Sequence, residues 1–227
     1  MQLQELPPDI STLKVLFNSS FPDFELIRDV IAKGNYSPDD LALAFAEYLD
    51  YNMWEYGDLL KSSDSPSEEE IKKLHTASVP EIVEILLDNH VNLYFRYDEM
   101  TILELATFVD IPSILPKLIK MILENGFDAN MVQDYETYLE FLDSEISFSL
   151  MEEDYHYRVE SLFITYIVAI GYGCVFSDGS IPIEVSDGFD ISNFRNYQDY
   201  GVEPFKEDGR ILYRYYEKTS HTIVAIY

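Results

Sequence analysis

A segment of this chain is repeated 36 residues further along, and the two copies align without a gap. Residues 80–104 read PEIVEILLDNHVNLYFRYDEMTILE, and residues 116–140 read PKLIKMILENGFDANMVQDYETYLE. Pro80 pairs with Pro116, and both copies end in the pattern Thr-x-Leu-Glu. A period of about 20 to 50 residues is typical of solenoids, in which each unit buries its apolar face against its neighbours. Because such folds mostly bind other molecules, the repeat favours binding over catalysis.

Each copy predicts a helix, a helix stop, an extended loop and a short second helix. In the first copy, Ser78-Val79-Pro80-Glu81 has the spacing of a capping box. The stops are Asn89-His90 and Asn125-Gly126, and Asn and Gly are residues that tolerate the left-handed conformation at helix ends. Similar helices ending in glycine are expected over residues 23–34 and 157–171. We therefore expect a mainly α fold, a solenoid of about four stacked helix pairs.

The end of the chain has a different pattern. Residues 209–227 contain the alternating run ILYRYY, a polar turn and the apolar run TIVAIY, which together predict a β-hairpin. A strand pair there would cover the apolar face of the last repeat, as an open solenoid requires. The expected organisation is helical repeats over residues 1–190 and a C-terminal β-hairpin extension over residues 191–227, packed into a single compact domain.

Three stretches of the sequence resemble a known repeat family. Residues 86–92 (LLDNHVN) and 122–130 (ILENGFDAN) resemble the helix ends of ankyrin repeats. Residues 101–106 (TILELA) resemble the Thr-Pro-Leu-His-x-Ala motif that opens the next ankyrin unit. The resemblance covers residues 78–145 most clearly. It implies antiparallel helix pairs stacked side by side, with projecting finger loops that form the partner-binding face together with the inner helices.

The sequence also departs from the ankyrin pattern. Its period is 36 residues, whereas the family favours about 33. Glu104 and Glu140 stand where the family has a histidine that ties neighbouring loops together. We therefore expect degenerate repeats that are less regular than those of the family.

The charge of the chain limits its partners. Its 15 Lys and Arg face 42 Asp and Glu, which gives a net charge of −27. Direct binding to nucleic acid needs clustered basic residues, and docking on an anionic membrane needs them too, so both are disfavoured. The acidity either serves solubility or matches a basic partner. The 18 Tyr and 14 Phe argue against disorder. A cytoplasmic protein is expected, because the chain has one cysteine and no signal-peptide pattern at Met1. A monomer is expected, because Lys218 and Arg214 discourage pairing through the edge of the C-terminal hairpin.

The sequence offers little for catalysis. Its four histidines lack the spacing of metal ligands, and Cys174 lies in an apolar stretch where a buried, inert thiol is expected. No glycine-rich phosphate loop is present. We therefore predict no catalytic residues, no cofactor and no metal. An enzyme that uses carboxylates remains a weaker alternative, because paired acids are common everywhere in so acidic a chain.

Two functions remain open. The first is a non-catalytic protein–protein interaction module whose acidic and aromatic face binds a basic protein partner. The second is an inhibitor or immunity-type protein that mimics nucleic-acid charge against a nuclease or DNA-binding protein. The predicted partner-binding residues lie on two finger loops and the helices that follow them: Tyr94, Arg96, Tyr97, Glu99, Glu104, Asn130, Gln133, Tyr135, Glu140 and Asp143.

Overall fold

The computed structural model describes residues 9–19, 21–61, 66–131 and 136–227. Helices make up 55% of it and strands 13%, and the strands form two small sheets. The chain divides into two compact units, residues 1–114 (unit 1) and residues 115–227 (unit 2). The expected ankyrin-like solenoid of about four stacked helix pairs, closed by a C-terminal β-hairpin, is therefore wrong.

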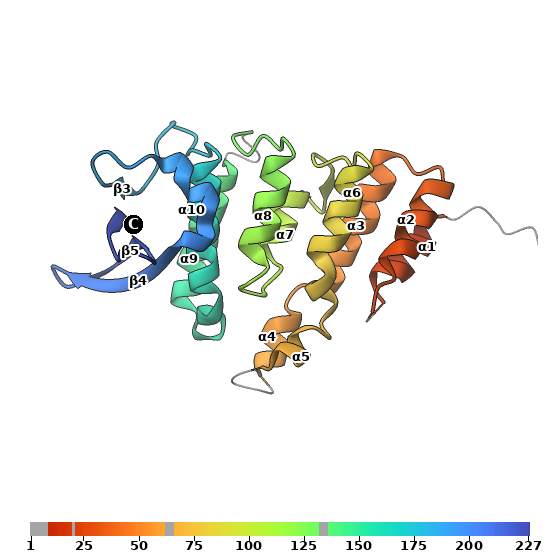
Figure 1. The fold of residues 1–227 in the computed structure, drawn as a ribbon, viewed down its shortest axis with the longest axis horizontal. Helices are drawn as coiled ribbons and strands as arrows, with labels where there is room; N and C mark the ends of the chain where they lie inside the picture. Colours follow the sequence, from red (N-terminus) through yellow and green to blue (C-terminus); the bar gives the residue numbers. More distant parts are fainter. Residues whose placement is uncertain (1–8, 20, 62–65, 132–135) are drawn as a thin grey trace, which may run out of the picture. The chain divides into compact units, whose positions relative to one another are not determined.

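Unit 1 consists of helices and one two-stranded sheet (Figure 1). Its elements are α1 (Ile10–Phe17), α2 (Phe24–Lys33), α3 (Pro38–Asn52), α4 (Glu55–Leu60), α5 (Glu68–Ile71), η1 (His75–Ser78), α6 (Val79–Asp88), β1 (Arg96–Tyr97), β2 (Met100–Thr101) and α7 (Ile102–Thr107). The helix expected over residues 23–34 is confirmed as α2, which has Asp23 as its N-cap and Gly34 as its C-cap.

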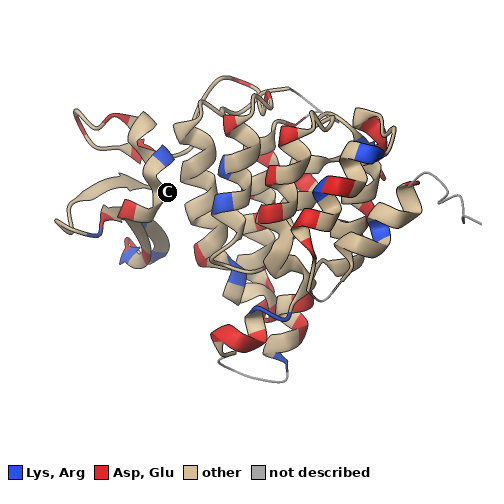
Figure 2. Ribbon diagram, turned by 45° about the vertical axis from the view of Figure 1, so that its right-hand side comes forward, with Lys and Arg blue, Asp and Glu red and all other residues tan. Residues whose placement is uncertain are grey.

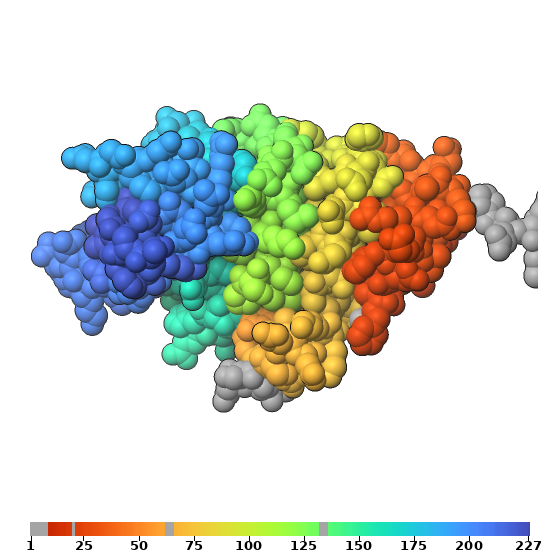
Figure 3. Space-filling view, in the orientation of Figure 1, coloured from red at the N-terminus to blue at the C-terminus, as the bar shows by residue number. Residues whose placement is uncertain are grey.

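The core of unit 1 forms where α1 packs against α3. The Phe17 ring of α1 meets the Tyr48 ring of α3 edge-on at 6.0 Å between centroids, and both side chains are buried. Helix α3 begins with a capping box, in which the Ser37 hydroxyl accepts from the Asp40 amide and the Asp40 carboxylate accepts from the Ser37 amide. In Figure 3 the red and orange atoms of this N-terminal region form a closely packed surface. The sequence of α3 thus builds both the helix and the core.

A buried carboxylate fixes the start of α4. Asp110 is 1% exposed and accepts hydrogen bonds from the amides of Tyr56 and Gly57, at 3.2 and 2.8 Å. These amides lie in the first turn of α4, where a helix has unpaired N–H groups and a partial positive charge. The residue before the helix, Trp54, is left-handed at φ 76°, and its ring packs edge-on against Phe108 at 5.4 Å.

Unit 2 consists of helices and a four-stranded sheet (Figure 1). Its elements are α8 (Leu115–Glu124), α9 (Tyr138–Met151), η2 (Glu153–Arg158), α10 (Val159–Gly171), β3 (Glu184–Val185), η3 (Ile191–Asp199), β4 (Tyr200–Glu207), β5 (Arg210–Glu217) and β6 (Ile223–Ile226). Every residue of α10 from Ser161 onward is buried, so this helix is the centre of the unit. The helix expected over residues 157–171 is thus present, beginning at Val159.

The C-terminal sheet has the strand order β3-β6-β5-β4, and all its pairs are antiparallel. Strands β5 and β6 correspond to the expected hairpin, but they are only two of four strands. Aromatic side chains attach this sheet to α10, because Phe163 stacks on Tyr213 at 4.2 Å and meets Tyr227 edge-on at 4.9 Å. The alternating aromatic residues of β5 therefore bury one sheet face against a helix of the same unit. The short β3, which lies before residue 190, joins this sheet as well.

The two copies of the 36-residue repeat have similar local structure. Helices α6 and α8 are each 10 residues long, and His90 and Gly126 follow them in the left-handed conformation at φ 58° and 88°. The predicted helix stops are therefore confirmed. The predicted capping box at Ser78 is wrong, because the Ser78 side chain makes no capping hydrogen bond. Ser78 instead ends the 3₁₀ helix η1, so its backbone already has helical geometry (φ −93°, ψ 0°).

Candidate protein-binding face

The finger of the first repeat copy is a tight β-hairpin. Arg96 pairs with Thr101 and Tyr97 pairs with Met100, so Asp98 and Glu99 form a two-residue turn. Both turn residues are left-handed, at φ 46° and 72°, as a type I′ turn requires. The Arg96 guanidinium donates to the Glu99 carbonyl, with Nε to oxygen at 2.9 Å. The hairpin therefore carries two adjacent exposed carboxylates at its tip.

Tyr97 links this hairpin to helix α3. Strand β1 contacts α3, and the Asp50 carboxylate of α3 is among the groups that raise the pKa of the Tyr97 hydroxyl. Burial is the largest cause of a raised pKa at the Tyr97 hydroxyl. Three nearby carboxylates raise that pKa further, those of Asp50, Asp98 and Glu47, because they disfavour a negative phenolate. Acidic groups from the helix and from the hairpin turn are thus concentrated around one phenol.

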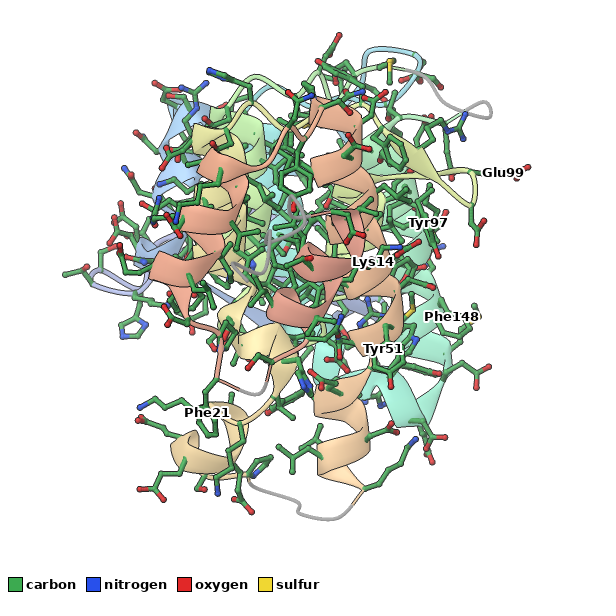
Figure 4. All side chains as sticks on the ribbon, turned by 90° about the vertical axis from the view of Figure 1, so that its right-hand side faces the viewer. Lys14, Phe21, Tyr51, Tyr97, Glu99 and Phe148 are labelled. Carbon is green, nitrogen blue, oxygen red and sulfur yellow. The ribbon has the colours of Figure 1, made fainter. Side chains whose placement is uncertain are left out.

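We call this surface the acidic–aromatic face. It consists of three residues of α3 and three of the hairpin: Glu47, Asp50, Tyr51, Tyr97, Asp98 and Glu99. Tyr51 has 80% of its surface exposed, which is high for a large aromatic side chain. In Figure 4, Glu99 extends away from the body of unit 1, and Tyr97 and Tyr51 lie on the same side of the view. The face therefore combines exposed aromatic area with negative charge.

Two cations lie beside this face, Arg96 of the hairpin and Lys14 of α1. Lys14 of α1 forms an ion pair with Glu47, and each side chain is about one-third exposed (Figure 4). Elsewhere in unit 1, red acidic segments outnumber blue basic ones along the helices (Figure 2). An exposed ion pair of this kind contributes little to stability. Lys14 therefore leaves most of the negative charge of the face unneutralised.

Glu104 and Glu140 have a capping function. Thr101 and Thr137 are the N-caps of α7 and α9, and their hydroxyls accept from the amides of Glu104 and Glu140. Each glutamate accepts in return from the amide of its threonine at 2.6 Å, which completes a capping box. Glu140 also accepts from the amide and hydroxyl of Ser177, at 3.1 and 2.6 Å. Both glutamates thus hold helix starts, where the ankyrin pattern has a histidine.

Asn130 and Asp143, predicted from the second copy, belong to unit 2 and make hydrogen bonds within it. The Asn130 amide donates to the Gly173 carbonyl and its oxygen accepts from the Val175 amide, both at 2.9 Å. The Asp143 carboxylate accepts from the Tyr227 hydroxyl at 2.6 Å. Gln133 and Tyr135 lie outside the described residues.

The remaining predicted finger residue is Tyr94, which is 43% exposed and lies in the loop before β1. The structure therefore brings Tyr97 and Glu99 together with α3, with Arg96 across the hairpin turn. Asn130, Glu140 and Asp143 make their hydrogen bonds within unit 2.

Sequence reasoning missed the contribution of α3. Glu47, Asp50 and Tyr51 are spaced three and four residues apart, so they share one side of a helix. Residues with polar groups at this spacing, within the apolar sequence of α3, predict an exposed stripe along the helix. The contact between that stripe and a hairpin more than 40 residues later is a tertiary contact, which the spacing of residues in the sequence does not show.

In the described part of the chain, no group of three or more His, Cys, Asp or Glu is placed to hold a metal ion. None of the helices in that part is both long and apolar enough to cross a membrane.

Comparison with protein-family models, curated proteins and solved structures finds no match for this chain. Its function is therefore inferred from the geometry of its own residues.

Proposed function

We propose that unit 1 is a protein-interaction module that binds a basic segment of a partner protein through the acidic–aromatic face. The observation that carries the proposal is the contact between α3 and the hairpin, which places the Asp50, Asp98 and Glu47 carboxylates near enough to the Tyr97 phenol to raise its pKa. Like charges held close together repel one another, and a cation placed between them relieves that repulsion. A Lys or Arg side chain of a partner is such a cation.

The aromatic residues supply the second component of binding. Tyr and Trp are enriched at protein interfaces because they provide large contact areas with little loss of side-chain freedom. Tyr51 is 80% exposed, and its ring can lie against the methylene chain or the charged head of Lys or Arg. Tyr97 lies in strand β1 and pairs with Met100, so its backbone is already ordered before binding. The face therefore suits a segment in which basic residues alternate with apolar ones.

The conformation of the hairpin tip is fixed before a partner binds. Its turn residues are fixed in the left-handed conformation and its Arg96 side chain is bonded across the turn, so the tip is preorganised. A preorganised surface loses less conformational entropy on binding than a flexible loop does. The non-enzymatic role and the resemblance to ankyrin repeats stay predictions, and the proposal rests on neither.

A peptide-binding assay tests the proposal. The full chain is titrated with a panel of peptides rich in Arg and Lys, and affinity is compared between the wild type and an Asp50→Asn, Asp98→Asn double variant. We expect binding to weaken about tenfold, as the loss of one or two charge-assisted contacts implies. Tyr51→Ala is expected to weaken it as well, because it removes aromatic contact area.

The matched control changes the same charge elsewhere. Glu68→Gln with Glu69→Gln removes two exposed carboxylates from the short helix α5, far in sequence from the face. This control should leave peptide affinity within about twofold of wild type at physiological salt, because screening limits distant charges. If both double variants lose affinity equally, only net charge acts, and the proposed face is refuted.

A further inference from the structure

A second candidate site lies within unit 2, where a pocket of about 370 Å³ opens between α8 and η3. Pockets that hold small molecules have volumes of about 300 to 1,000 Å³. The lining includes three cationic side chains, Lys117, Lys120 and Arg195, together with the apolar or aromatic side chains of Met121 and Tyr197. In size and lining, the pocket therefore fits a small ligand with an anionic group.

The concentration of cations here is unusual for this chain. Unit 2 contains eight of the 15 Lys and Arg, and three of the eight line this one pocket. Two carboxylates, Glu124 and Asp199, also line it, so the cations exceed the anions by one. In a chain with a net charge of −27, the pocket is a local region of positive charge.

Glu124 is already held by neighbouring groups. Its carboxylate accepts from the Tyr172 hydroxyl at 2.5 Å, and Lys120 lies 3.7 Å from the same oxygen, Oε1. The Lys120 ammonium group has three N–H donors and needs only one of them for Glu124, so it keeps donors for another acceptor. Lys117 is exposed, and no carboxylate of the described residues lies within ion-pair distance of it.

Arg195 is fixed in place before any ligand binds. Its Nε donates to the Gly171 carbonyl at 2.7 Å, and its guanidinium lies over the Tyr172 ring, 4.7 Å from the centroid. Gly171 allows η3 to approach closely, since a Cβ at this position would lie 2.9 Å from the Arg195 backbone nitrogen. Within the described chain, the terminal amino groups of Arg195 have no other hydrogen-bond acceptor. A guanidinium held in this way presents two parallel donors, which match the oxygens of a phosphate.

We infer that this pocket binds a small phosphate monoester. Three cations from two elements can surround a group that carries about −1.5 to −2 charges near neutral pH, whereas a carboxylate carries only one. The volume exceeds what a phosphate group alone would fill, and the lining also includes Met121 and Tyr197, against which a sugar or a ring can pack. The inference is independent of the proposed function, because the pocket uses only residues of unit 2.

Isothermal titration calorimetry of the full chain at low salt tests the inference. The probes are inorganic phosphate, a nucleoside monophosphate, a phosphoserine peptide and acetate. We expect saturable one-site binding of the nucleotide, weaker binding of inorganic phosphate, and weakening of both as salt is raised. Tighter binding of the phosphopeptide than of the nucleotide would support the phosphate chemistry and identify a modified protein as its source.

Two variants with the same charge change make the test specific. Lys117→Gln removes an exposed cation of the pocket, and Lys206→Gln removes an exposed cation of strand β4, outside it. Lys117→Gln is expected to weaken nucleotide binding about tenfold, and Lys206→Gln less than about twofold. The absence of saturable binding at about 10 mM probe, equal losses in the two variants, or acetate binding as tight as phosphate would overturn the inference.

Discussion

Replacing Arg158 with Met is expected to destabilise unit 2 by about 3 to 5 kcal/mol. The Arg158 side chain is 0% exposed, and its NH1 lies 3.3 Å from Oε2 of Glu145, which is 17% exposed. Methionine fills much of the same volume but leaves the Glu145 carboxylate with no cationic partner in a largely buried site. The cost arises chiefly from that unpaired charge, because breaking one side of a buried pair is more destabilising than removing the pair.

The loss of stability should depend on pH. Burial raises the pKa of Glu145, and the positive charge of Arg158 opposes that rise. Without Arg158 the pKa of Glu145 in the folded state moves further above its unfolded value. A carboxyl group with a raised folded pKa stabilises the folded state when it is protonated, and that stability disappears as the pH rises through the folded pKa. The variant should therefore lose more stability at about pH 7 than at about pH 4.

Hydrogen exchange measures this effect where it arises. Amides of α9 and α10 are followed by mass spectrometry at two pH values, and urea unfolding is followed by far-UV circular dichroism. A double variant, Arg158→Met with Glu145→Leu, serves as the comparison. It is expected to be more stable than Arg158→Met alone, because it leaves no buried charge without a partner.

Two results would refute the reasoning on Arg158. One is a double variant no more stable than Arg158→Met alone, which would show that the unpaired Glu145 carboxylate is not the source of the cost. The other is an equal loss of stability at both pH values, since a charged carboxylate must respond to protonation.

Three further predictions concern unit 2. Thr137→Val removes the N-cap of α9 and should destabilise the unit by about 1 kcal/mol in urea unfolding. The pKa of Glu140 is lowered, chiefly by the hydrogen bond from the Ser177 hydroxyl. The stability that this carboxylate contributes is therefore present above its unfolded pKa and should disappear as the pH falls through its folded pKa. Glu140→Gln should make stability depend less on pH when unfolding is measured from about pH 6 to pH 3. Burial raises the pKa of Cys174 to about 12, so the thiol should react with a disulfide reagent at about pH 8 only after urea unfolds the protein.

The elements of local structure were largely predictable from the sequence. Helices α2 and α10, with the helix stops at His90 and Gly126, follow from apolar spacing and from residues that accept left-handed backbone. From the sequence, Glu104 and Glu140 are interpreted as departures from a family pattern and as partner-binding residues. The spacing Thr-x-x-Glu is also that of a capping box, and this local chemistry explains both glutamates.

The larger architecture was not predictable in the same way. The solenoid failed because the C-terminal strands, whose aromatic residues pack against α10, form a four-stranded sheet instead of a covering hairpin. The short β3 gave no sequence signal, since two residues cannot show an alternating pattern. The acidic–aromatic face was predicted only in its hairpin half. Its other half, including Asp50, depends on a contact between distant segments, which residue spacing along one helix does not reveal.

The position of β6 determines the order in which the C-terminal sheet can assemble. Strands β4 and β5 are joined by a two-residue turn at Asp208 and Gly209, so they can pair early as a local hairpin. Strand β3 can pair only with β6, which brings residue 184 beside residue 226 and closes a long loop at a greater entropic cost. The sheet should therefore form from β4 toward β3, and a chain that stops before residue 223 would leave β3 with no strand to join.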